Sequence, residues 1–105
     1  MSYRFILPAD VENQVYDCAL FIARDNPGRA LSWVDEVVEM MESVCEWPDA
    51  HSVDESMSRL VGRTIRRRAF GEYLMFYEVD MQARAVVTHL FIHAKRDRSS
   101  DEAPA

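Results

Sequence analysis

Two apolar stripes at helical spacing fill the first half of the chain, and a short polar turn separates them. The first stripe consists of Val11, Val15, Cys18, Ala19 and Ile22, and the second of Ala30, Val34, Val37, Met41, Val44 and Cys45. Because residues three and four positions apart share one face of a helix, each stripe predicts an amphipathic helix. The first half therefore predicts a helical hairpin.

Capping residues mark the starts of both predicted helices. Asp10 stands just before the first apolar stripe and is the predicted N-cap of the first helix. The turn is Asp25-Asn26-Pro27-Gly28, in which Asn26 is the predicted cap of the second helix. Pro27 fits the first turn of that helix, where no backbone N–H donor is needed.

The second half of the chain is typical of β structure. Residues 64–70, 73–79 and 83–93 are rich in aromatic and β-branched side chains, and short loops separate them. Residues 3–7 predict a further strand that ends at Pro8, and residues 49–61 are expected to be a connection. The predicted fold is α+β, with the N-terminal strand and the two-helix hairpin packed on an antiparallel, mainly three-stranded sheet.

With 105 residues, the chain has room for one domain and one core. We expect this domain to span residues 1–98, followed by a flexible tail at 99–105. No apolar run approaches the roughly 18–20 residues of a membrane span, and the N-terminus does not resemble a secretory signal. The expected location is the cytoplasm.

Charge is distributed unevenly along the chain, whose formal net charge is −6. Residues 1–58 contain three arginines and twelve Asp or Glu, a local charge of −9. Residues 59–105 contain nine Lys or Arg and six acids, a local charge of +3. The basic half coincides with the predicted strands, where a run of charge needs an explanation.

That run is Arg66-Arg67-Arg68, at the start of the predicted sheet. Side chains alternate between the two faces of a strand, so Arg67 faces away from its two neighbours. A two-residue turn at Gly71-Glu72 would place Arg66 and Arg68 on the face of Tyr73, and a longer turn would change these partners. One interpretation is an edge strand protected by charge against aggregation. The other is a cationic, aromatic-lined surface for an acidic partner or nucleic acid.

Metal and catalytic motifs are sparse. His89 and His93 face the same way on one predicted strand but lie roughly 13 Å apart, too far to share an ion. No metal or other cofactor is predicted, and Cys18 and Cys45 are expected to be core thiols. His93, close to Lys95 and Arg96, is the one weak candidate for acid–base catalysis.

In this order and spacing, the segments resemble the RelE/ParE family of bacterial type II toxins. The resemblance rests on residues 5–10 (FILPAD), 22–27 (IARDNP), 65–79 (IRRRAFGEYLMFYEV) and 93–97 (HAKRD). It implies a toxin that is neutralised by a small cognate antitoxin. It also implies an antitoxin- or target-binding surface formed by Arg66, Arg67, Arg68, Tyr73, Lys95 and Arg96.

Two activities occur among such toxins: RelE-like members cut mRNA in the ribosome, whereas ParE-like members poison DNA gyrase. Here Leu74 stands where the ribonucleases typically have an arginine, and the tail after Arg96 has no tyrosine or histidine. The acidic net charge also disfavours direct nucleic-acid binding. The resemblance therefore favours a ParE-like gyrase inhibitor without enzymatic activity, with a ribosome-dependent endoribonuclease or a non-toxic interaction protein as the alternatives. A homodimer and a toxin–antitoxin heterotetramer are both compatible with it.

Overall fold

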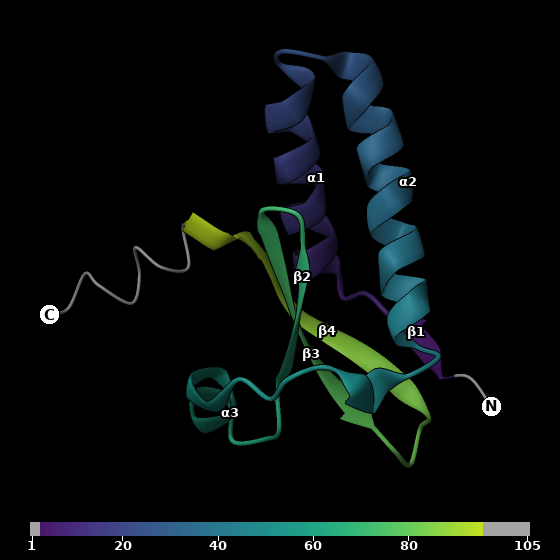
Figure 1. Ribbon diagram of the computed structural model, residues 1–105, viewed down its shortest axis with the longest axis vertical. Coiled ribbons are helices and arrows are strands. Elements are labelled where there is room, and N and C mark those ends of the chain that lie inside the picture. Colours follow the sequence, from purple (N-terminus) through teal and green to yellow (C-terminus); the bar gives the residue numbers. More distant parts are fainter. Residues whose placement is uncertain (1–2, 96–105) are drawn as a thin grey trace, which may run out of the picture.

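The computed structural model describes residues 3–95, which form a helical hairpin laid against a twisted sheet (Figure 1). The far end of the hairpin projects beyond the sheet (Figure 1). Along the chain the elements are β1 (Arg4–Ile6), α1 (Ala9–Ala23), α2 (Pro27–Val44), the 3-10 turn η1 (Pro48–Ala50), α3 (Glu55–Val61), β2 (Arg66–Phe70), β3 (Tyr73–Asp80) and β4 (Ala85–His93).

The two long helices begin differently. The Asn26 side chain accepts a hydrogen bond from the backbone N–H of Arg29 at 3.0 Å, and Pro27 opens α2, as predicted. The prediction that Asp10 caps α1 is wrong, because α1 begins at Ala9, directly after the extended Pro8. Asp10 instead lies in the first turn of α1, where a carboxylate is favoured by the positive end of the helix dipole.

The sheet has four strands in the order β1-β4-β3-β2. Strands β2, β3 and β4 form an antiparallel meander, and β1 joins it in parallel to the first part of β4. Phe70 pairs with Tyr73 across Gly71-Glu72, and Gly71 has a φ of 57°, which suits a two-residue hairpin turn. The predicted α+β class is confirmed, and β1 adds a parallel strand to its antiparallel sheet.

A β-bulge interrupts the pairing of β3 with β4. Phe76 pairs with Leu90 and Tyr77 with Thr88, so His89 is an extra residue on β4. An extra residue reverses the alternation of side chains, and the expectation that His89 and His93 share a face is therefore wrong.

The hairpin covers one face of the sheet and builds the main core. That core includes Val11, Val15, Trp33, Val37, Met41, Met75, Tyr77, Val86 and Phe91. A smaller cluster of Ile65, Leu74 and Phe76 lies on the opposite face, which we call the outer face, where Met57 of α3 packs against it.

The segment 49–61, expected to be a connection, contains both η1 and α3. The carboxylate of Asp54 caps α3 by accepting from the backbone N–H of Met57 at 2.9 Å, and Gly62 ends the helix at a φ of 82°. No residue of α3 is fully buried, which explains why its apolar pattern is weak. Within residues 3–95, no helix is both long and apolar enough to cross a membrane.

Candidate partner-binding groove

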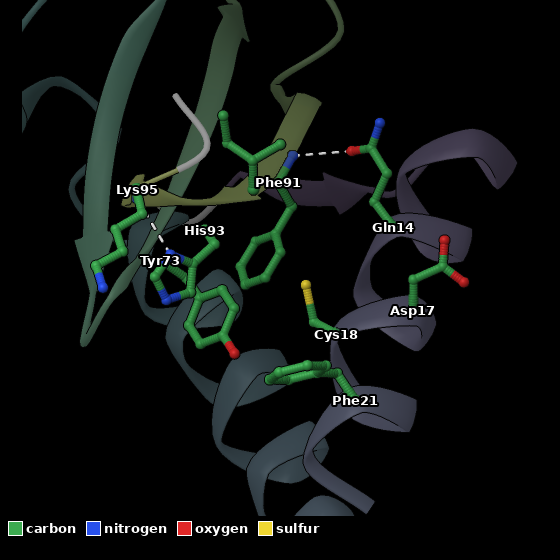
Figure 2. Close-up of a pocket in the computed structure, with 9 residues that line it drawn as sticks. Gln14, Asp17, Cys18, Phe21, Tyr73, Phe91, His93 and Lys95 are labelled. Carbon is green, nitrogen blue, oxygen red and sulfur yellow. Dashed lines mark hydrogen bonds between the residues drawn. The ribbon is translucent and has the colours of Figure 1, made fainter. Parts of the chain in front are cut away.

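A groove of about 600 Å³ opens between α1 and the ends of β3 and β4. Figure 2 shows side chains from both layers facing this space. Its apolar lining comprises Cys18 and Phe21 of α1, Tyr73 of β3 and Phe91 of β4, and its polar rim comprises Gln14, Asp17, His93 and Lys95.

Packed aromatic rings form the floor of the groove. Tyr73 and Phe91 lie nearly parallel, with ring centroids 5.7 Å apart, because their strands pair side by side with both side chains toward the helices. The buried Trp33 ring supports both from below, at 5.1 Å from Tyr73 and 6.0 Å from Phe91. Tyr73 is the partly exposed ring of the floor, and the buried Phe91 and Trp33 hold it in place, so this ring loses little freedom when a partner covers it.

Phe21 forms the opposite wall and remains 66% exposed. The guanidinium of Arg24 lies over its ring at 5.9 Å from the centroid. Burial raises the pKa of Tyr73, and the nearby Cys18 and Glu72 add to this effect. The phenol therefore stays neutral at physiological pH, and the lining of the groove carries no charge from Tyr73.

His93 on the rim is held through both ring nitrogens. Its Nδ1 accepts from the backbone N–H of Lys95 at 3.1 Å, so Nε2 carries the proton that faces the Glu72 carboxylate at 3.2 Å. The ring also meets Tyr73 edge-on, with centroids 5.1 Å apart. These contacts fix the orientation of the imidazole.

Beside the groove, β4 has an uncovered edge, which we call the β4 edge. β1 pairs with β4 only as far as Val87, because Pro8 follows it and offers no backbone N–H. Beyond that point no other described strand lies on this side of β4. The backbone N–H of Phe91 points away from β3 and donates instead to the Gln14 side-chain oxygen at 2.9 Å (Figure 2).

The three arginines of β2 lie apart from the groove residues, and two of them, Arg66 and Arg67, contact the chain's own segment 49–54. Arg66 donates to the carbonyl of His51 at 2.6 Å, and Arg67 pairs with the Asp54 carboxylate at 3.3 Å. Arg68 donates to the carbonyl of Ala69. Burial, together with the positive charges of Arg68 and Arg66, lowers the pKa of His51.

Comparison with known families now adds to this geometry. A profile of the family described as "ParE toxin of type II toxin-antitoxin system, parDE" matches residues 5–98. The chain belongs to this ParE toxin family. No curated protein matches it. The family match confirms the resemblance to RelE/ParE toxins, and a toxin of this family implies an antitoxin as its partner.

The structure brings together only some of the residues that the family resemblance suggested. Tyr73, His93 and Lys95 meet at the groove, whereas Arg66 and Arg68 lie at β2 on the helix-covered side of the sheet. Arg67 lies on the outer face, where its partner is Asp54. Arg96 and the expected tail at 99–105 fall outside the described residues.

Sequence reasoning missed the contribution of α1 to the groove. Gln14, Asp17 and Phe21 were not singled out, and Cys18 was expected to lie in the core. The available signal was Phe21, a large aromatic that falls beside the apolar stripe of its helix. Among residues 3–95, no three His, Cys, Asp or Glu side chains lie close enough together to hold a metal ion.

Proposed function

We propose that this ParE-family toxin inhibits DNA gyrase, and that a cognate antitoxin neutralises it by binding the groove between α1 and β4. The observation that carries the antitoxin part is the exposed apolar groove next to the β4 edge. Phe21 and the partly exposed Tyr73 supply apolar area, with the buried Phe91 beneath them, and Lys95 on the rim can pair with an acidic residue of the partner. A protein segment with an apolar anchor and a nearby acidic residue would match this chemistry.

Several observations support gyrase rather than mRNA as the target. Leu74, at the position where ribonucleases typically have an arginine, packs with Ile65 and Phe76 in the outer-face cluster. Arg67 pairs with the Asp54 carboxylate and Arg66 donates to the His51 carbonyl, so both guanidinium groups already have partners within the chain. A surface whose cations are engaged in this way is poorly suited to gripping RNA phosphates.

A supercoiling assay tests the proposal directly. Purified toxin added to gyrase and relaxed plasmid should reduce supercoiling, and adding its cognate antitoxin, to be sought among the short reading frames next to the toxin gene, should restore it. A topoisomerase that needs no gyrase subunit serves as the control and should be unaffected. Normal supercoiling at toxin excess, with transcripts cut inside codons after induction, would instead establish the RelE-like alternative.

A further inference from the structure

The β4 edge presents backbone groups that a further strand could pair with. Phe91 N–H points away from β3, as its bond to Gln14 shows, and Ala94 N–H points toward β3, where it donates to the Glu72 carbonyl at 2.8 Å. Because alternate residues of a strand direct their backbone groups to the same side, the N–H and C=O of His93 face the same way as those of Phe91. The edge therefore offers two residues, Phe91 and His93, with which no described strand pairs on this side, and the Phe91 N–H is bonded to a side chain instead.

Gln14 occupies the place that the backbone of a neighbouring strand would take. Its side-chain carbonyl approaches Phe91 N–H at 2.9 Å, the distance of a regular ladder hydrogen bond. Gln14 lies on α1, 77 positions before Phe91 in the sequence. Its side chain satisfies the Phe91 N–H, which β1 does not reach because its pairing with β4 ends at Val87. The side-chain carbonyl of Gln14 thus accepts the hydrogen bond that a backbone carbonyl of a neighbouring strand would otherwise accept.

We propose that the β4 edge accepts an extended peptide segment as a fifth strand, and that Gln14 must first release Phe91 N–H for this strand to form. The inference rests on the proposed function, since the segment would belong to the antitoxin. Side chains of the added strand that face the helices would enter the groove between Phe21 and Phe91. The end of β1 at Ile6 limits the strand on one side.

An extended segment suits this site better than a helix does. A helix satisfies its own backbone and would leave Phe91 N–H bonded to Gln14, whereas a strand supplies a carbonyl for that donor and partners for His93. The two occupants thus differ in one measurable property, which is the protection of the Phe91 and His93 amides from hydrogen exchange.

The test uses Gln14→Met, which keeps the side-chain length and removes the hydrogen-bond acceptor. Asn13→Met, at the exposed neighbouring position of α1, is the matched control for adding an apolar side chain. In the free toxin, Gln14→Met should speed hydrogen exchange at the Phe91 amide, and the control should not. Because the antitoxin strand no longer competes with Gln14, its affinity should rise by roughly two- to tenfold for Gln14→Met alone.

Binding of the cognate antitoxin to the wild-type toxin should also protect the amides of Phe91 and His93 together. Binding without protection of these amides would overturn the fifth strand while leaving the proposed antitoxin role intact. Weaker binding by Gln14→Met than by Asn13→Met would likewise overturn it, because Gln14 would then be a direct contact. Absence of any binding to the wild-type toxin would refute the antitoxin role itself.

Discussion

The β2 and β4 edges of the sheet differ in how their outward-facing backbone groups are paired. At β2, the chain covers its own edge: Arg67 N–H donates to the Ser52 carbonyl at 2.9 Å, and Asp54 N–H donates to the Ile65 carbonyl at 2.8 Å. A single bridge between Val53 and Arg66 completes this contact. At β4, coverage by β1 stops at Val87, and one glutamine side chain substitutes for a strand farther along.

We interpret the β2 edge as protected by the chain itself and the β4 edge as the one available to a partner. The arginine-rich strand is the more conspicuous signal in the sequence, yet its charges contact the segment that covers the β2 edge. That geometry favours the edge-protection interpretation of Arg66-Arg67-Arg68. The β4 edge has little charge in its sequence but combines an apolar groove with unpaired backbone, which are the features that bind protein segments.

The largest expected effect concerns the wall of the groove. Phe21→Glu should weaken antitoxin binding by about 2 kcal/mol, or roughly 30-fold, because an aromatic anchor is replaced by a charge in the apolar groove. Leu20→Glu is the matched control, since Leu20 is 65% exposed, against 66% for Phe21, and does not line the groove. Titration calorimetry gives both affinities. Equal losses for the two variants would move the interface to the hairpin as a whole.

The next effect tests how the β2 edge is covered. Asp54→Ala removes both the cap of α3 and the partner of Arg67, so the free energy of unfolding should fall by about 1–2 kcal/mol. Asp49→Ala should change it little, because that carboxylate is 71% exposed and lies 3.9 Å from Arg66. Urea denaturation measures both. Hydrogen exchange at the Arg67 amide should accelerate only in Asp54→Ala, and equal behaviour of the two variants would contradict this account.

A smaller effect on antitoxin affinity is expected from removing a single positive charge, and we compare Lys95 at the groove with Arg67 at β2. Lys95→Gln should weaken antitoxin binding by about threefold to tenfold, mainly by slowing association, because Lys95 lies on the groove rim. Arg67→Gln should leave the affinity nearly unchanged, since Arg67 lies on the outer face next to Asp54. Stopped-flow association at two salt concentrations separates the variants. A larger loss for Arg67→Gln would place the interface at β2.

The smallest effect is a pH dependence at the β2 edge. The pKa of His51 is lowered in the folded protein, so the unfolded chain takes up this proton at a higher pH. The free energy of unfolding should therefore decrease as the pH falls through the ordinary histidine range. His51→Gln should remove that part of the decrease. Thermal melts of both proteins between pH 7.5 and pH 5 provide the measurement, and identical slopes would show that His51 does not contribute.

Much of the fold follows from local patterns in the sequence. The apolar stripes and the Asn26-Pro27 start of α2 specify their structures through nearby residues, and these predictions are confirmed. At Gly71-Glu72, where the sequence leaves the turn length open, the chain forms the two-residue turn. The error at Asp10 is local, since α1 begins at Ala9, earlier than its capping pattern predicts. The other errors arise where a distant contact decides: α3 depends on the packing of Met57 against the outer-face cluster, and the bulge at His89 reflects how β3 fits β4.

The site was harder to predict than the fold for the same physical reason. Tyr73, His93 and Lys95 were identified because they stand in segments that resemble the toxin family. Phe21 and Gln14 belong to the groove only because α1 packs over β4. The sequence pattern around either residue does not predict that packing.

The pairing of β1 with β4 has a consequence for the order of events during synthesis. Arg4 pairs with Ala85, 81 positions later, and the groove combines residues of α1 with residues near the end of the described chain. The hairpin can form early, but neither the groove nor the β4 edge exists until almost the whole domain has been made. On the proposed binding mode, a nascent chain has no completed groove, so an antitoxin that binds there must do so after translation rather than during it.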